Sequence, residues 1–201
     1  MQIPTPTMVL ATRNRGKLQE FRALLEPAGW EVIGLSDLSI TRDVAETGKS
    51  FAENARLKAI SYSNDTDLPV LADDSGLEVF SLDGKPGIES ARYAGPGASD
   101  SDRVRKLLAM LERAGCSRAA RFVCALAMAQ WGALVLEAEG ECRGEIAREP
   151  LGNNGFGYDP IFCVPELGRT FAELDEKVKN RISHRARAVA ALLEGLRRRH
   201  W

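Results

Sequence analysis

Residues 121–142 read RFVCALAMAQWGALVLEAEGEC, and this stretch decides the fold class. Apolar and polar residues alternate on both sides of Trp131-Gly132, which predicts two long strands joined by a tight turn. Strands joined in this way run antiparallel, so the sheet that contains them is not purely parallel.

Outward from this hairpin, strands and helices alternate along the chain. Apolar runs predict short strands, and apolar residues at helical spacing predict helices. The predicted strands are 7–12, 30–34, 70–72, 77–82 and 161–164, and the predicted helices are 17–26, 50–62, 101–114 and 183–196. Residues 170–173, TFAE, match a capping box. This order predicts a mixed α/β fold, and residues 1–201 are expected to form a single domain.

Composition and charge exclude several classes of protein. The chain is 44% hydrophobic and 27% charged, with a formal net charge of -1. A polymeric nucleic acid is not expected as the partner, because such binders usually carry a basic excess. No signal peptide or membrane span is visible, so we expect a cytoplasmic protein without a membrane partner. The cysteines and histidines lack zinc spacing, so a bound metal should have oxygen ligands, as Mg²⁺ or Mn²⁺ prefers.

Residues 70–78, VLADDSGLE, place two aspartates at the end of an apolar run. Adjacent carboxylates repel each other unless a positive group lies near them. One interpretation is that these aspartates cap a turn through local hydrogen bonds. The other is that Asp73 and Asp74, with Glu46 beside them, bind a divalent cation whose coordination shell a substrate phosphate completes.

Three further polar stretches lie at the ends of predicted elements. Residues 12–17, TRNRGK, open a helix whose N-terminus could bind a phosphate, or they are only a capped helix start. In residues 155–159, GFGYD, Phe156 could stack on a flat ring, or the loop is simply tight with buried aromatics. Residues 179–185 supply Lys179, His184 and Arg185 as donors, or form a basic helix face. Together these stretches describe a nucleotide site.

Six stretches, in this order along the chain, are similar to the motifs of one enzyme family. They are TRNRGK (12–17), ETGKSFAENARLKA (46–59), LADDSGLEV (71–79), PGIESARYAG (86–95), GFGYDPIF (155–162) and SHRARA (183–188). On these motifs the chain resembles, from Val9 to Leu196, the inosine triphosphate pyrophosphatase family, which hydrolyses non-standard purine nucleoside triphosphates.

The resemblance implies both an architecture and a reaction. It implies an elongated mixed α/β sheet flanked by helices, with two lobes around a central cleft, and usually a homodimer. It also implies Mg²⁺-dependent hydrolysis of ITP, dITP and XTP to the nucleoside monophosphate and pyrophosphate, which cleanses the nucleotide pool.

Carried over by position, the resemblance also implies residue roles. Asp74 is expected to be a metal ligand and the general base, and Glu46 the second metal ligand. Many relatives carry two consecutive acids before the Thr-Gly, whereas this chain has Ala45-Glu46, so only Glu46 is a candidate there. The residues expected to contact the substrate are Thr12, Arg13, Asn14, Arg15, Gly16, Lys17, Ser75, Phe156, Gly157, Tyr158, Asp159, Lys179, His184 and Arg185.

Two other functions remain open from the residues alone. The first is a metal-dependent phosphatase that uses an aspartyl nucleophile. The adjacent aspartates after an apolar strand resemble the acidic motif of such enzymes, although those enzymes usually space the two acids as DxD. A nucleotide-binding module without catalysis is the second alternative. Release of pyrophosphate, release of orthophosphate and binding without turnover would separate the three.

Overall fold

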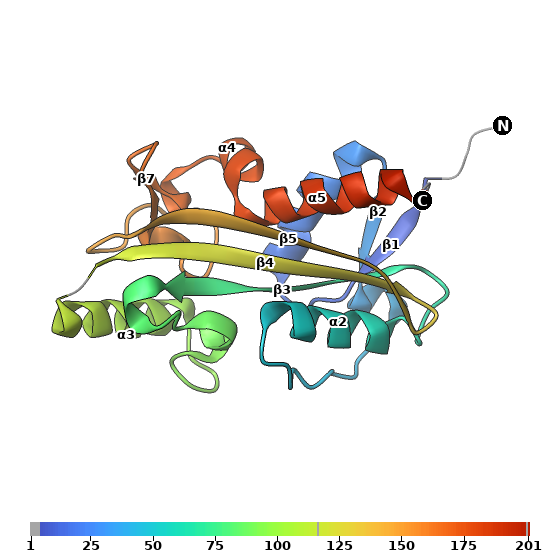
Figure 1. Cartoon of the computed structure of the whole chain (residues 1–201), viewed down its shortest axis with the longest axis horizontal. Coiled ribbons are helices and arrows are strands. Elements are labelled where there is room, and N and C mark those ends of the chain that lie inside the picture. The colour runs from blue at the N-terminus through green and yellow to red at the C-terminus, as the bar shows by residue number, and fades with distance from the viewer. Residues whose placement is uncertain (1–4, 116, 200) are drawn as a thin grey trace. The chain divides into compact units, whose positions relative to one another are not determined.

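The described part of the chain, residues 5–115, 117–199 and 201 of a computed structural model, contains one mixed sheet of seven strands. The strand order is β2-β1-β3-β4-β5-β6-β7 (Figure 1). β1 pairs parallel with β2 and β3, whereas β6 pairs antiparallel with β5 and β7. The strands are β1 (Thr7–Leu10), β2 (Glu31–Gly34), β3 (Val70–Val79), β4 (Ala119–Gln130), β5 (Ala133–Ile146), β6 (Phe162–Val164) and β7 (Arg169–Thr170). The predicted mixed α/β fold is confirmed.

Helices flank this sheet. They are α1 (Arg15–Leu25), α2 (Phe51–Tyr62), α3 (Asp100–Ala114), α4 (Glu176–Ile182) and α5 (His184–Arg198), with short 3₁₀ turns between elements. Helices α1, α2, α3 and α5 have bounds close to the predicted ones, whereas α4 was not predicted. The predicted hairpin is β4 and β5. Its turn residues Trp131 and Gly132 have φ of 50° and 75°, the left-handed values that a tight hairpin turn requires. None of the helices in the described ranges has the length and apolar character that a membrane span needs.

The prediction that a strand ends at Asp73-Asp74 is wrong. β3 continues from Val70 through both aspartates and through Ser75-Gly76 to Val79. Acidic residues and a Ser-Gly pair indicate a turn when they are solvated, but here both aspartates are buried and have partners, so the strand continues. The predicted strand 77–82 is therefore the end of β3 followed by a 3₁₀ turn at Phe80–Leu82.

Residue contacts divide the chain into two compact units, and each is described by itself. The first contains the residues up to Asp74, Cys124–Gly140 and the chain from Arg185 onward; the second contains Ser75–Val123 and Glu141–His184. Strands β3, β4 and β5 contribute residues to both. The expected single domain over residues 1–201 stays a prediction.

In the first unit, α1 and α5 share one hydrophobic cluster with the strands. Phe21 and Leu25 of α1 and Leu192 of α5 pack with Leu71 of β3 in that cluster, and all four are fully buried. Figure 1 shows α2 on the face of the strands opposite to α5. The strands of this unit are therefore covered on both faces, which explains their nearly continuous apolar sequences.

The core of the second unit is aromatic. The ring centroids of Phe122 and Phe162 lie 4.6 Å apart, and those of Phe162 and Phe171 lie 5.0 Å apart. The apolar side of α3, with Leu107 and Leu111 buried, belongs to the same cluster. This core supports the loop at 155–159, because buried Tyr158 at the end of that loop is part of it.

Candidate active site

Asp73 lies on the α1 side of β3, where Lys17 and Cys124 contact its carboxylate. Lys17 Nζ lies 2.6 Å from Asp73 Oδ2, and the Cys124 thiol donates to Asp73 Oδ1 at 3.1 Å. Asn14 caps α1, because its Oδ1 accepts the Lys17 N–H at 3.0 Å, and this fixes the turn from which Lys17 extends. Burial alone would raise the pKa of the Asp73 carboxyl, but Lys17 and Arg185 outweigh burial and hold that pKa well below its usual range.

Asp74 faces the opposite side of β3, toward α2, as alternation along a strand requires. Lys58 Nζ lies 3.1 Å from Asp74 Oδ1 and 2.9 Å from Glu46 Oε1, and it also donates to the Asp73 carbonyl at 2.7 Å. Asn54 Nδ2 donates to Asp74 Oδ2 at 3.2 Å. Lys58 therefore lies between two carboxylates that are far apart in sequence.

The pKa shifts in this cluster follow from burial and charge. Burial is the largest influence on Asp74 and raises the pKa of its carboxyl, although Lys58 and Lys17 act in the opposite direction. Burial would lower the pKa of Lys58, but the carboxylates of Asp74, Glu46 and Asp73 outweigh it and the pKa is raised. Lys58 thus stays charged, and Asp74 has a more basic carboxylate than a solvated aspartate.

These contacts correct one hypothesis and extend another. The two aspartates were expected to share one cation, but they lie on opposite faces of the strand, and each has an ammonium partner of its own. The expected proximity of Glu46 and Asp74 is present, because both contact Lys58. Sequence reasoning missed Asn54 and Lys58. Their spacing of four residues, which puts two polar side chains on the buried face of α2, was the signal available.

The donor set fits a hard divalent cation. Glu46 and Asp74 both direct a carboxylate oxygen at the Lys58 ammonium and therefore lie near each other. Mg²⁺ is usually held by one or two carboxylates together with water and substrate phosphates. In the described ranges, no group of three or more His, Cys, Asp or Glu side chains could hold a metal by itself. A metal here would therefore depend on the substrate for part of its shell.

The loop and first turn at the start of α1 form a basic hollow. A cavity of about 240 Å³ is lined by Thr12, Arg13, Asn14, Arg15, Leu18, Leu35 and Ser36. Backbone N–H groups at a helix N-terminus, together with basic side chains, suit an anion such as a phosphate. Gly16 and Lys17 follow in the same turn, so all six residues predicted from this motif lie together.

The second unit holds the glycine-rich loop at 155–159. Asp159 Oδ2 accepts the Phe156 N–H at 2.9 Å and lies 2.6 Å from Lys179 Nζ. A Cβ at Gly155, where φ is 73°, would lie 2.0 Å from the same oxygen, so only glycine fits there. The Lys179 ammonium lies 5.4 Å from the centre of the Phe156 ring. The Asp159 carboxylate thus links Phe156 with Lys179.

Neighbouring side chains fix the rest of this loop. The Gly157 N–H donates to Asp100 Oδ2 at 2.7 Å, and Tyr158 Oη donates to the Ser90 carbonyl at 2.9 Å. Burial raises the pKa of Tyr158, so its hydroxyl stays protonated. The loop is therefore anchored to the start of α3 and to the 3₁₀ turn at Gly87–Arg92.

Comparisons with known proteins identify the family. The model of the Ham1 family matches residues 8–195. The chain belongs to the Ham1 family. A dITP/XTP pyrophosphatase of Gloeobacter violaceus is 53% identical, covering 95% of this chain and 94% of its own length. One of Geobacillus kaustophilus is 50% identical, with 93% and 92% covered. A solved HAM1 protein structure from Coxiella burnetii is 45% identical, with a TM-score of 0.86, covering 96% of this chain and 99% of that one.

Within this Ham1 chain, the remaining predicted residues have clear positions. Arg185 Nη1 lies 2.8 Å from Glu20 Oε2 in the first unit. The His184 ring stacks on Phe122 in the second, with ring centroids 4.6 Å apart. Ser75 follows Asp74 in β3. The substrate contacts expected of all these residues stay predictions.

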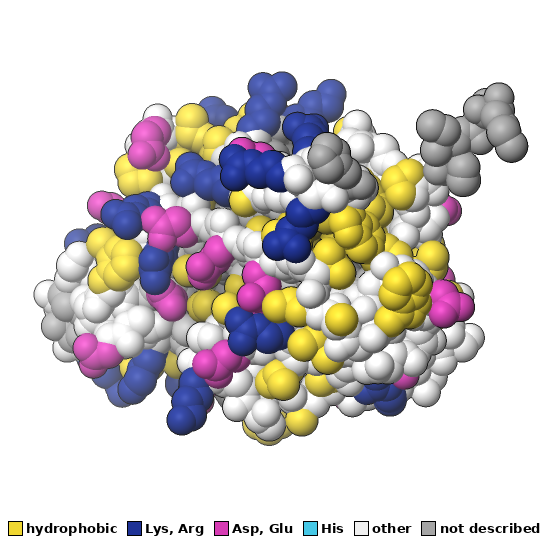
Figure 2. All heavy atoms as spheres, turned by 45° about the vertical axis from the view of Figure 1, so that its right-hand side comes forward, with side chains coloured by type: hydrophobic (Ala, Val, Ile, Leu, Met, Phe, Trp, Pro, Cys, Tyr) yellow, Lys and Arg dark blue, Asp and Glu magenta, His cyan; other side chains and the backbone are white. Residues whose placement is uncertain are grey.

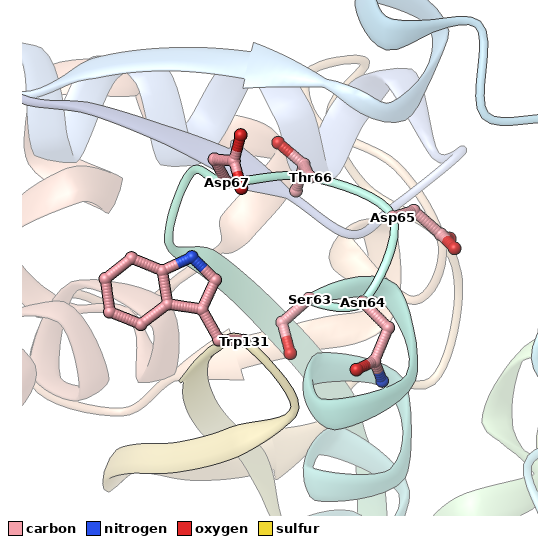
Figure 3. Close-up of a pocket in the computed structure, with 6 residues that line it drawn as sticks. All are labelled: Ser63, Asn64, Asp65, Thr66, Asp67 and Trp131. Carbon is pink, nitrogen blue, oxygen red and sulfur yellow. The ribbon is translucent and has the colours of Figure 1, made fainter.

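A second hollow in the first unit contains none of the predicted site residues. It has a volume of about 480 Å³ and is lined by Ser63, Asn64, Asp65, Thr66, Asp67 and Trp131 (Figure 3). The Gly132 N–H donates to Ser63 Oγ at 3.0 Å, and Gln130 Nε2 donates to the Asp67 carbonyl at 2.8 Å. The hairpin tip is therefore attached to the loop that follows α2.

Replacing Lys58 by methionine should destabilise this Ham1 chain strongly. Both Asp74 and the Asp73 carbonyl would lose a buried cationic partner, which costs about 3–5 kcal/mol when one member of a buried pair is removed. Arg56→Met is the matched control on the same helix, because its pair with Glu137 is half-exposed and should contribute less than about 1 kcal/mol. Urea unfolding measures both, and equal losses for the two variants would contradict this assignment.

Proposed function

We propose that the chain is a Mg²⁺-dependent hydrolase that converts dITP, XTP and ITP to the nucleoside monophosphate and pyrophosphate, acting on the cytoplasmic nucleotide pool. The observation that carries this proposal is the buried Asp74 carboxylate with a raised pKa, beside Glu46 and Lys58. Its relatives of about 50% identity over nearly their whole length bear the name dITP/XTP pyrophosphatase.

In the proposed reaction, Asp74 takes a proton from a water molecule. The water oxygen bonds to the α-phosphorus, and the bond from that phosphorus to the oxygen bridging to the β-phosphate breaks. Bound Mg²⁺ would supply charge neutralisation on the phosphate oxygens, held by Glu46 and Asp74. In the first unit, Lys17 would stabilise the negative charge of the departing pyrophosphate, and the N-terminus of α1 would bind phosphate oxygens. The same role for Lys179 stays a prediction from the sequence.

Base selection follows from hydrogen-bond chemistry. Inosine and xanthosine carry a 6-keto acceptor, whereas adenosine carries a 6-amino donor. Donors from His184, Arg185 or nearby backbone would pair with the keto oxygen, and Phe156 would stack on the ring. Opposite an amino group such donors stay unpaired, which costs about 1–3 kcal/mol for each buried group.

A panel of nucleoside triphosphates tests the function. The panel contains ITP, dITP, XTP, ATP and GTP, each with Mg²⁺. For ITP, dITP and XTP we expect pyrophosphate and the monophosphate as products. One unpaired buried donor predicts a kcat/KM for ITP about tenfold or more above that for ATP. Orthophosphate as the product would favour the aspartyl phosphatase alternative, and tight binding without turnover would favour a binding module.

Changing Asp74 to asparagine should lower kcat by orders of magnitude and leave the fold intact. Burial raises the pKa of the Asp74 carboxyl in the metal-free chain, so titration of this carboxyl without Mg²⁺ should give a midpoint above about pH 4, the value of a solvated carboxyl. The Asp74→Asn chain should lack this titration. Asp37→Asn, at an exposed aspartate bonded to the Gly34 N–H, is the control. A folded Asp74 variant with near-normal turnover would exclude the residue as the base.

A homodimer is also part of the proposal. Trp131 at the hairpin tip is 71% exposed, and Leu134 beside it is 39% exposed. Figure 2 shows hydrophobic side chains gathered on the face turned toward the viewer. Light scattering at micromolar concentration should give twice the mass of one chain, and a monomer mass would contradict this part of the proposal.

A further inference from the structure

The segment that carries Glu46 has no regular structure of its own. Between the 3₁₀ turn at Leu35–Leu38 and the start of α2 at Phe51, residues 40–48 form neither helix nor strand. The position of Glu46 therefore depends on side chains that reach this segment from elsewhere. We refer to residues 40–48 as the Glu46 loop.

Arg13 contacts the backbone and one side chain at the start of this loop. Its Nη2 donates to the carbonyls of Thr41 and Arg42 at 2.6 and 2.8 Å, and its Nε donates to Asp43 Oδ1 at 2.8 Å. Nη2 also donates to the Ile40 carbonyl at 3.4 Å, so one guanidinium binds four consecutive residues of the loop. A planar group with several fixed donors suits this task, and an ammonium does not.

The ion pair between Arg13 and Asp43 contributes less to this contact than the hydrogen bonds to the backbone. Arg13 and Asp43 side chains are 46% and 84% exposed, and ion pairs of this kind contribute little to stability. The bonds to two successive carbonyls instead fix the direction of the backbone. Only two residues separate Asp43 from Glu46, so a backbone fixed at Asp43 restricts where the Glu46 carboxylate can lie.

The loop is also attached to α2 and to the segment that follows α2. Arg42 Nε donates to Asp65 Oδ2 at 2.8 Å, and its guanidinium lies 4.9 Å from the centre of the Tyr62 ring. Near the end of the loop, the Gly48 N–H donates to Asn54 Oδ1 at 2.8 Å. Arg13 joins this loop to the motif at the start of α1.

Arg13 lies between Thr12 and Asn14, in the motif expected to bind phosphate. The sequence prediction made Arg13 itself a substrate contact, but its Nε and Nη2 are directed at the Glu46 loop. We propose that Arg13 is a positioning residue: it holds the Glu46 loop against the phosphate motif so that Glu46 stands ready beside Asp74 for the divalent cation. The expected effect of Arg13 on the Mg²⁺ requirement rests on the proposed function. The expected effect of Arg13 on the stability of the Glu46 loop does not.

Hydrogen exchange in the metal-free, nucleotide-free chain tests the structural part. The amides of Gly48 and Lys49 are reporters, because they bond to Asn54 and to Glu53 Oε2. In Arg13→Ala they should exchange about tenfold faster or more, since the loop opens more often. Arg22→Ala is the matched control: Arg22 Nε donates to the Val32 carbonyl at 2.9 Å and does not reach the loop. Unchanged exchange in a folded Arg13 variant would overturn the inference.

A magnesium titration tests the kinetic part. Arg13→Ala should raise the Mg²⁺ concentration that gives half-maximal rate by about tenfold, with kcat at saturating Mg²⁺ within about twofold of wild type. Arg13→Lys should not restore the wild-type requirement, because an ammonium cannot replace the fork of donors. Arg22→Ala should leave the requirement unchanged.

The alternatives give different results. If Arg13 contacts the substrate directly, Arg13→Ala raises KM for the nucleotide at every Mg²⁺ concentration and leaves the Gly48 and Lys49 amides unchanged, which overturns the inference. If wild type does not hydrolyse any triphosphate, the proposed function fails, whereas the exchange experiment still decides whether Arg13 holds the loop.

Discussion

The arrangement of the first unit depends on the alternation of side chains along β3. Asp73 and Asp74 are adjacent in sequence, so a strand must direct them to opposite faces. Each buried carboxylate then requires a positive partner from the layer that covers its face. Lys17 of α1 supplies one and Lys58 of α2 supplies the other. Two adjacent acids thus fix the positions of two helices on opposite sides of one strand.

This requirement explains why polar residues occupy buried positions on otherwise apolar elements. Buried ion pairs seldom add stability beyond what a hydrophobic pair would give, but they penalise any arrangement that leaves one charge without its partner. Lys58 contacts Glu46, Asp74 and the Asp73 carbonyl, so a shift of α2 would remove a cationic partner from two carboxylates. Burial of Asp74 beneath α2 raises the pKa of its carboxyl although Lys58 acts in the opposite direction, which relates the packing of α2 to the chemistry proposed for that residue.

Much of the fold could be predicted from sequence, because apolar periodicity directly reflects burial. The hairpin around Trp131-Gly132 and helices α1, α2 and α3 follow from local pattern and turn chemistry. The course of β3 could not be predicted in this way, since Asp73, Asp74 and the Ser75-Gly76 pair all indicate a turn. Only partners distant in sequence make those aspartates compatible with a buried strand. The motifs identified Glu46 and Asp74 from the sequence. The contact of Lys58 with both carboxylates depends on how α2 packs, so the sequence alone did not indicate it.

The buried thiol of Cys124 can report how often the interior of this unit opens. Cys124 is fully buried on β4, bonds to Asp73, and has a pKa well above that of a solvated thiol. A thiolate is the reactive species, so an alkylating reagent can modify this sulfur only after the strand and its neighbours separate. The labelling rate of Cys124 would therefore report how often the ion-paired centre opens in the intact molecule, without any attached probe.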